Sequence, residues 1–346
     1  MSLNRNISTL FSTFTFFISV SFCSLTIAGV SSTSQPDFDN WVERIKKQAQ
    51  SQGISSNTLD NVFSNVQQIQ TGRNTHKQIS TEESLSYSLT SKQINMNKRL
   101  VSHYSDVLFE IKHLFGVNPE VIIALWGIDN GQGQSKKLQP AIDVLTSLSY
   151  QQPSNTQIKN ELFQALKIID EGRVSNLQLK SDANGLLGST PFNPTAFRNY
   201  AIDYDGDGKV DVWQNHADIF ASTANYLNKI GWKMGEPWGL EIKLPIDFNP
   251  KLVGLNQQRN ITQWQEIGVR MPDGSDLPGI TTGMGSIISP STQHSSGNTY
   301  LVFENYFALL RWKRSQEFAF AVGMMVDKIK QPSEIAPLMP FADVSQ

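Results

Sequence analysis

The chain contains 346 residues, of which 39% are hydrophobic and 17% are charged, and its formal net charge at pH 7 is −2. This is the composition of a globular protein, and the length is sufficient for one large domain or for two to three small ones. The near-neutral charge excludes a global positive field, so we expect no nucleic acid partner, although a local groove could still bind another anionic polymer.

The first 28 residues have the pattern of an export signal. Arg5 supplies a positive charge, residues 10–28 are largely apolar, and Thr26-Ile27-Ala28 places small side chains at both recognition positions of a cleavage site. The same stretch could instead form a buried N-terminal helix, or remain as a membrane anchor, because its length approaches the ~20 residues that span a bilayer. Cleavage would release the protein into the periplasm, and we expect membrane contact only if the signal is retained.

The only cysteine, Cys23, lies inside this signal. The mature chain would therefore contain no thiol, which excludes a disulfide framework and a cysteine metal site. Residues 29–37 are expected to form a polar linker and the Pro-rich residues 331–346 a tail. Residues 38–330 are left to build the hydrophobic core.

Helical spacing of apolar residues dominates the first part of the mature chain. It predicts helices from about residue 37 to 53 and from 55 to 63, and over most of 85–115. Residues 121–128 differ because they are apolar on all sides, which is typical of a helix at the centre of a domain. That helix is followed at once by Asp129, so the sequence predicts a carboxylate at the end of a buried helix.

The remaining chain mixes helical patterns with a short β-rich stretch. We expect a loop rich in Gly, Ser and Pro over 182–194, and helices near 141–149, 156–171, 195–201, 217–230 and 304–329. Short apolar alternations separated by turn residues predict strands near 242–244, 267–269, 284–288 and 300–303. The sequence thus predicts an α+β fold that is mainly α, with a small β insertion.

The sharpest local motif is the segment 203–211, which matches the beginning of an EF-hand loop, with glycine at position six. The expected ligands within the loop are three carboxylates and one backbone carbonyl, from Asp203, Asp205, Asp207 and Lys209. Position twelve is Gln214, where Glu is usual, so we expect Asp218 to replace it. Four carboxylates within nine residues repel each other without a cation, which favours a structural Ca²⁺ site over a simple acidic surface turn.

Several segments resemble the lytic murein transglycosylase B family. Residues 123–133 look like its catalytic helix, in which an apolar run ends in Trp-Gly-(apolar)-Glu-(Ser/Thr)-Asn-(aromatic)-Gly. Residues 199–227 resemble its calcium loop and the helix that follows. The segments that resemble its C-terminal part are 264–268, 300–303 and 315–323. These motifs occur in the family's order over about residues 38–330, which is far more specific than any one of them.

The resemblance implies a lysozyme-like helical core and an EF-hand-like loop. The implied parts are a helical N-terminal part at 38–115, a catalytic core at 116–235, a β-rich part at 236–303 and a closing helix at 304–330. Family members cleave the bond from N-acetylmuramic acid to N-acetylglucosamine without water, because the C6 hydroxyl of the muramyl sugar attacks its own C1 and leaves a 1,6-anhydro product. One Glu acts first as general acid and then as general base. The implied partner is the glycan strand of peptidoglycan, and we expect a monomer.

Four positions depart from the family's pattern. The catalytic Glu corresponds to Asp129, a Ser before the glycine-rich segment to Asp182, a substrate-holding Gln to Pro191, and a groove-lining Asn to Lys313. Further substrate contacts are expected from Phe192, Asn193 and Tyr200. Asp129 keeps the carboxyl group but is one methylene shorter than Glu, and a displacement of about 1 Å can cost on the order of 100-fold in rate.

These departures leave two hypotheses for the function. In the first, the protein is a lytic transglycosylase that uses Asp129 as its sole acid and base. In the second, it binds or scaffolds murein through the same groove without turnover, since the altered positions fall in active-site segments while the packing motifs are kept. Both hypotheses predict binding to glycan strands.

Overall fold

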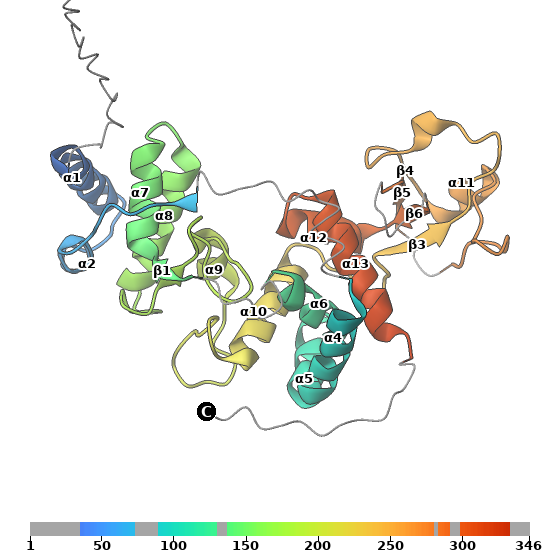
Figure 1. The fold of residues 1–346 in the computed structure, drawn as a ribbon, viewed down its shortest axis with the longest axis horizontal. Helices are drawn as coiled ribbons and strands as arrows, with labels where there is room; N and C mark the ends of the chain where they lie inside the picture. Colours follow the sequence, from blue (N-terminus) through green and yellow to red (C-terminus); the bar gives the residue numbers. More distant parts are fainter. Residues whose placement is uncertain (1–34, 73–88, 130–136, 280–282, 291–297, 333–346) are drawn as a thin grey trace, which may run out of the picture.

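The structure, a computed structural model, describes residues 35–72, 89–129, 137–279, 283–290 and 298–332. Figure 1 shows an elongated molecule with a helical lobe at one end, a β-rich lobe at the other and the remaining helices between them. The helices are α1 (Gln35–Ser51), α2 (Ser56–Phe63), α4 (Ser91–His103), α5 (Ser105–Phe115), α6 (Pro119–Asp129), α7 (Ala141–Gln151), α8 (Thr156–Asp170), α9 (Pro194–Tyr200), α10 (His216–Lys229), α11 (Ile261–Glu266), α12 (Glu304–Trp312) and α13 (Gln316–Lys330). The strands are β1 (Gln139–Pro140), β2 (Lys180–Ser181), β3 (Gly239–Ile242), β4 (Gln258–Arg259), β5 (Gly285–Ile288) and β6 (Thr299–Val302).

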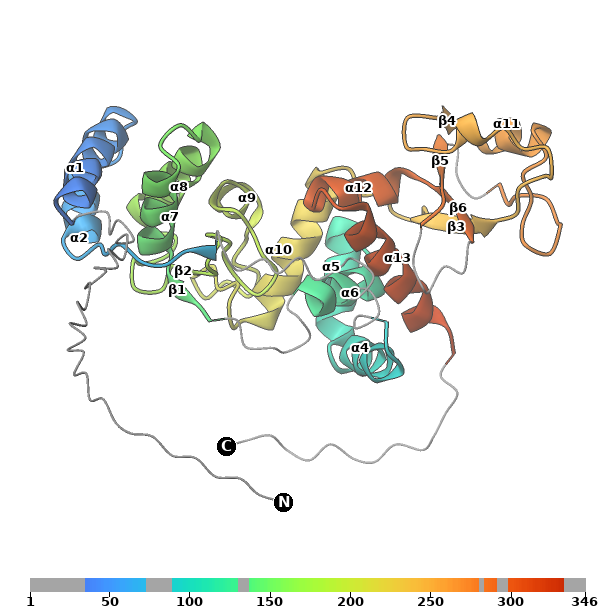
Figure 2. The ribbon, with the colours of Figure 1, turned by 45° about the horizontal axis from the view of Figure 1, so that its top comes forward.

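The expected fold class, mainly helical with a small β insertion, is confirmed. Helix α6 lies at the centre of the middle part because its sequence leaves it no polar face. Helices α4, α5, α10 and α13 pack around it, as Figure 2 shows. Gly127 allows α4 to come close, since a Cβ at this position would lie 2.9 Å from Oδ1 of the buried Asn97. This packing fixes the last turn of α6 and hence the position of Asp129.

The helical lobe, at the end of the molecule opposite the β-rich lobe, consists of α1, α2, α7 and α8. Helices α7 and α8 pack on each other, and α1 and α2 cover them. Tyr150 on α7 receives the ring edges of Phe38 and Trp41 from α1, with ring centroids 5.3 and 6.1 Å away. The short antiparallel ladder β1–β2 pairs Gln139 with Ser181 and leads the chain into the glycine-rich segment.

The β-rich lobe has a small hydrophobic core of its own. Its sheet has the order β3-β6-β5-β4 with antiparallel neighbours, and Ile287 lies opposite Leu301. Trp264 of α11 is fully buried in this core and donates its Nε1 to the carbonyl of Gly285 at 2.9 Å. Trp238 joins the lobe to the body by donating its Nε1 to Asp327 of α13 at 3.0 Å. Burial raises the pKa of that Asp327 carboxyl.

The expected single helix at 304–329 is wrong, because the chain breaks between α12 and α13. Lys313 has an extended backbone, with φ −142° and ψ 121°, so the helix cannot continue through it. The Ser315 hydroxyl accepts a hydrogen bond from the backbone N–H of Phe318 at 3.1 Å and caps the start of α13. This break turns Trp312 and Lys313 towards the end of α6.

Several further details differ from the sequence expectation. Residues 267–269 form the turn that ends α11, and only the isolated pair of Lys243 with Arg270 continues the sheet there. The helical stretch expected over 85–115 divides at Tyr104 into α4 and α5. Helix α11 and strand β4 were not predicted, because each is shorter than the pattern that periodicity can detect.

Within the part of the chain that the structure describes, no helix combines the length and the apolar character needed to cross a membrane. The expected signal at 1–28 and most of the linker and tail lie outside the described residues. The same holds for residues 130–133, which directly follow Asp129.

Candidate active site and acidic loop

The carboxylate of Asp129 ends α6 and is almost completely enclosed, with 1% of its side chain exposed. Trp312 donates its Nε1 to Oδ2 at 3.0 Å, and the Nζ of Lys313 lies 3.3 Å from Oδ1. Trp312 ends α12 and Lys313 begins the break that follows it, so both partners lie more than 180 positions along the chain from Asp129. The structure therefore brings together two residues that the sequence singled out, Asp129 and Lys313. It adds Trp312, which was not among the predicted site residues.

The two ends of this ion pair have very different surroundings. A carboxylate removed from water is stable only with compensating partners, and Lys313 supplies the positive charge. The Lys313 side chain is itself 55% exposed, and its Nζ lies 4.4 Å from the centre of the Phe318 ring. Asp129 is thus enclosed by the protein, whereas the Lys313 side chain is accessible to solvent.

A row of aromatic rings extends from Trp312 across the middle of the molecule. The Trp312 and Tyr226 rings lie 4.7 Å apart, and Tyr226 stacks on Tyr200 at 4.7 Å and 11°. Burial raises the pKa of Tyr226, with smaller contributions from Tyr200 and Glu161. Tyr226 falls within the segment 199–227 that resembles the family, and its ring contacts place it between Tyr200 and Trp312.

The glycine-rich segment contacts this row of rings through Phe192, which lies against Tyr226 and Trp312. The expected substrate contact through Phe192 stays a prediction; in this structure its side chain is fully buried, and the centroid of its ring lies 5.7 Å from that of Trp312. Asn193 uses its Oδ1 to accept the backbone N–H of Ala196 at 2.7 Å, which caps α9. Pro191 lies in the turn that precedes Phe192. This segment therefore packs against the aromatic row and leads into α9.

Asp182 organises the turn that leads into the glycine-rich segment. Its Oδ1 accepts the backbone N–H groups of Asn184 at 2.8 Å and of Leu186 at 2.9 Å. A Ser side chain is shorter and uncharged, so the Asp that replaces it can hold two donors more firmly. The described contacts of this carboxylate are with the chain's own backbone.

The acidic loop brings together three of its five expected ligands. Carboxylate oxygens of Asp203, Asp205 and Asp218 lie within 4.8 Å of one another. Asp218 is fully buried, and its two oxygens accept the backbone N–H groups of Tyr204 at 2.7 Å and Asp211 at 2.8 Å. Asp218 therefore joins the loop from α10, where the usual position twelve is unsuitable.

The other two expected ligands are placed differently. Asp207 lies outside the group of three, with its Oδ1 accepting the backbone N–H of Lys209 at 2.8 Å. The carbonyl of Lys209 remains a prediction. Three oxygen donors that converge in this way suit a hard cation such as Ca²⁺.

The electrostatics of the triad fit a cation. Burial raises the pKa of Asp218, and the neighbouring Asp205 and Asp203 raise it further. The Asn215 amide, which donates to Asp205 at 2.7 Å, lowers the pKa of Asp205. Within the described residues these three carboxylates form no ion pair with a basic side chain.

His216 at the start of α10 connects the two acidic centres. Its ring stacks on Tyr104 with centroids 5.0 Å apart, and Trp126 meets it edge-on at 5.6 Å. Burial lowers the pKa of His216, and His103 lowers it further. Because Asn215 both caps α10 and holds Asp205, a continuous series of contacts leads from the loop to α6 one turn before Asp129.

The structure thus defines a mainly helical protein with a β-rich lobe and an enclosed carboxylate at the end of its central helix. Comparison with family models gives the class a name: the model described as Transglycosylase SLT domain matches residues 37–327. The chain belongs to this family.

Individual relatives agree with this assignment. Membrane-bound lytic murein transglycosylase B of Escherichia coli (strain K12) is 29% identical over 237 residues, which cover 65% of this chain and 60% of that protein. The match thus spans less than two thirds of the relative's length. The crystal structure of SltB3 from Pseudomonas aeruginosa in complex with NAG-anhNAM-pentapeptide is 30% identical, with a TM-score of 0.77, covering 88% of this chain and 83% of that chain.

The fold extends to more distant structures. The lytic transglycosylase Slt35 of Escherichia coli, solved in complex with calcium, is 21% identical with a TM-score of 0.69, covering 85% of this chain and 92% of that chain. The expected resemblance to the lytic transglycosylase B family and the lysozyme-like helical fold are confirmed.

Proposed function

We propose that this protein is a lytic transglycosylase that cleaves the bond from N-acetylmuramic acid to N-acetylglucosamine in peptidoglycan glycan strands. The observation that carries the proposal is the enclosed carboxylate of Asp129 at the end of α6, where the resembled family has its acid and base. The name of the Escherichia coli relative, and the glycan peptide bound by SltB3, support the same substrate class.

The reaction needs one carboxyl group because the substrate supplies the nucleophile. The C1–O4 bond of the muramyl sugar breaks and a C1–O6 bond forms in the same ring. Asp129 gives its proton to O4 of the leaving N-acetylglucosamine and then takes the proton of the C6 hydroxyl. One proton has moved from O6 to O4, and Asp129 returns to its starting state. Asp182, Pro191, Asn193 and Tyr200 remain proposed groove residues that position the strand.

A second function, binding of murein without turnover, is favoured by one observation. The Lys313 ammonium lies 3.3 Å from Asp129, and a cation this close stabilises the ionised carboxylate, which cannot donate a proton. Pro191, which lacks a side-chain donor or acceptor where the family has Gln, points in the same direction. Both functions require the groove and differ only in whether a product forms.

Digestion of purified sacculi separates these functions. We expect 1,6-anhydro-muropeptides from the parent protein and none above background from Asp129→Asn, whose side chain has the same shape and whose folding is checked by circular dichroism. A parent without product, combined with product from Asp129→Glu with Pro191→Gln, contradicts the enzyme and supports the binding protein. Sedimentation with sacculi measures the binding that both functions predict.

The acidic loop adds a proposed structural Ca²⁺ ion. Asp203, Asp205 and Asp218 would hold the ion together with Asp207 and the carbonyl of Lys209, and a bidentate carboxylate or water would bring these five donors to the six to eight oxygen ligands that Ca²⁺ takes. Isothermal titration of the chelated protein with Ca²⁺ tests this directly, and the absence of binding heat counts against it. The export signal expected at 1–28 supports a location in the periplasm, where peptidoglycan lies.

A further inference from the structure

The ion pair of Asp129 with Lys313 must open before Asp129 can act as an acid. Protonation of the leaving O4 requires a protonated carboxyl group, whereas the ammonium at 3.3 Å and the Trp312 N–H at 3.0 Å both stabilise the ionised form. Any productive substrate therefore has to weaken at least one of these contacts. The question is which part of the substrate can do so.

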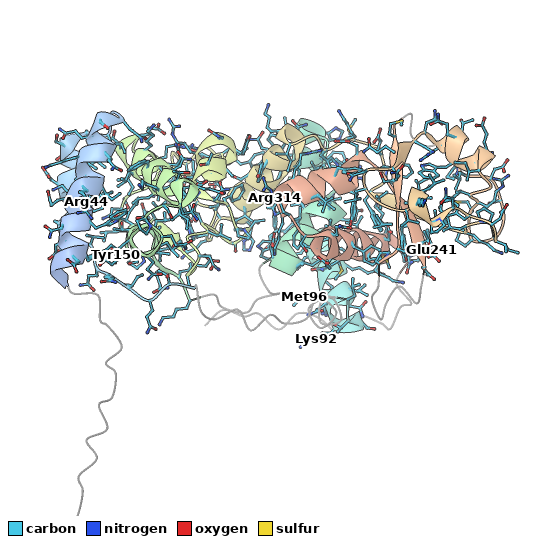
Figure 3. All side chains as sticks on the ribbon, turned by 90° about the horizontal axis from the view of Figure 1, so that it is seen from above. Arg44, Lys92, Met96, Tyr150, Glu241 and Arg314 are labelled. Atoms are coloured by element: carbon cyan, nitrogen blue, oxygen red, sulfur yellow. The ribbon has the colours of Figure 1, made fainter. Side chains whose placement is uncertain are left out.

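Of the two partners, the lysine is the one that an incoming group meets first. The Asp129 side chain is 1% exposed, but the Lys313 side chain is 55% exposed and belongs to the extended break between α12 and α13. Its neighbour Arg314 is also exposed, and Figure 3 shows it near the middle of the elongated molecule. An anion on the substrate would thus compete with Asp129 for the ammonium group.

The muramyl sugar carries one group next to the scissile bond that can be such an anion. Its lactyl substituent on C3 ends in a carboxyl group, which in intact peptidoglycan forms an amide with the stem peptide and is uncharged. In strands from which the peptide has been removed, the same carboxyl group is free and negatively charged at neutral pH. The two strand types therefore differ by one charge within the sugar that the acid must serve.

Resting on the proposed function, we propose that Lys313 selects glycan strands with a free lactyl carboxylate, that is, strands without stem peptides. The carboxylate pairs with the ammonium and frees Asp129 to take up the proton it needs. A neutral Asn at this position, as in the resembled family, has no charge with which to make this distinction. The reaction that supplies the substrate is then hydrolysis of the amide between the lactyl group and the peptide.

The experiment compares two substrates with the full-length protein: glycan strands carrying their peptides, and the same strands after enzymatic removal of the peptides. We expect the parent to favour peptide-free strands in kcat/KM by about tenfold, the scale of one charge-assisted contact. Lys313→Asn should bring the ratio close to one, and Lys313→Arg should keep it. Lys251→Asn, the same change at an exposed lysine of the β-rich lobe, serves as the matched control and should behave as the parent.

Several outcomes overturn the inference. A ratio that survives Lys313→Asn shows that another group reads the substrate, and an equal loss of rate on both strands shows that Lys313 has only a structural or catalytic role. A parent that favours peptide-bearing strands, with the preference lost when the peptide carboxylates are amidated, shows that the anion belongs to the peptide.

Failure of the proposed turnover gives a different pattern. If no variant forms product, the same comparison is made by measuring binding of the two strand types. Tighter binding of peptide-free strands that depends on Lys313 supports the proposed selection by Lys313 and contradicts only the proposed turnover. Equal binding of both strand types by the parent overturns the selection itself.

Discussion

The two acidic centres of the molecule balance their negative charge in opposite ways. At the end of α6 a single enclosed carboxylate, Asp129, is paired with the ammonium of Lys313. In the acidic loop, Asp203, Asp205 and Asp218 lie together, and their described donors are backbone N–H groups and the Asn215 amide. The first centre supplies its own counter-charge, whereas the second is short of positive charge.

This difference agrees with the two proposals, a substrate site at Asp129 and an ion site in the acidic loop. A carboxylate with an internal cation changes its state only when a ligand displaces that cation, so the substrate can control its chemistry. Three carboxylates served by uncharged donors repel each other, so the proposed Ca²⁺ ion would stabilise the loop by relieving that repulsion. His216 follows Asn215, which holds Asp205, and contacts Trp126 of α6, so it lies between the two centres.

The largest effect is expected where the loop depends on its buried carboxylate. Asp218→Ala leaves the N–H groups of Tyr204 and Asp211 without their partner, and we expect a loss of about 3 kcal/mol of unfolding free energy. Urea denaturation followed by tryptophan fluorescence measures it. Because Asp207 is itself a proposed Ca²⁺ ligand, both variants are compared in the presence of a Ca²⁺ chelator, where the control Asp207→Ala, at an exposed loop position outside the triad, should lose less than about 1 kcal/mol. Equal losses in the two variants contradict the central role of Asp218.

Addition of Ca²⁺ should raise the unfolding free energy by nearly as much as Asp218→Ala lowers it. A ligand at 100 times its dissociation constant stabilises the folded state by about 2.7 kcal/mol, so the melting temperature of the parent should rise. The rise in melting temperature should vanish in the double variant Asp203→Asn with Asp205→Asn. It should persist in Asp129→Asn, because Asp129 is already paired with Lys313 and is not expected to bind Ca²⁺. A rise that survives the double substitution places the ion elsewhere.

The ion pair at the other centre should respond asymmetrically when either partner is removed. Lys313→Met leaves an enclosed carboxylate without its cation, and we expect a loss of about 2 kcal/mol, less than for a fully buried pair because Lys313 is half-exposed. Asp129→Asn leaves a lysine that water can solvate, so a loss below about 1 kcal/mol is expected. Chemical denaturation of both variants gives the comparison, and equal losses contradict the enclosed setting of Asp129.

The sequence could locate both centres because each rests on local patterns. An all-round apolar run predicts a buried helix, so Asp129 was found at its end, and alternate acidic positions with glycine predict the loop. Asp218 could be proposed because it begins the next helix within reach of the loop. The four-residue strands at 285–288 and 299–302 were also found from their alternation.

What the sequence could not provide are the partners that arrive from distant positions. The apolar spacing of 304–329 continues through the helix break, so periodicity gave no sign that Lys313 is extended, and Ser315 as a helix cap was the only local signal. A lysine in place of a family Asn was visible, but its pairing with Asp129 depends on tertiary packing across 184 positions. The full burial of Phe192 likewise follows from the helices around it.

The smallest effect separates the two donors that share the Asp129 carboxylate. Trp312→Phe keeps a ring against Tyr226 but removes the N–H at 3.0 Å from Oδ2, so we expect a loss of about 1 kcal/mol in urea denaturation. Tyr226→Phe, which keeps the same row of rings, controls for disturbed stacking. Because both donors stabilise one charge, the combined Trp312→Phe and Lys313→Met variant should differ from the sum of the single losses by at least about 0.5 kcal/mol. Strict additivity would mean that the tryptophan and the lysine act on separate groups, and the carboxylate would no longer be the point where the two helices α12 and α13 control the end of α6.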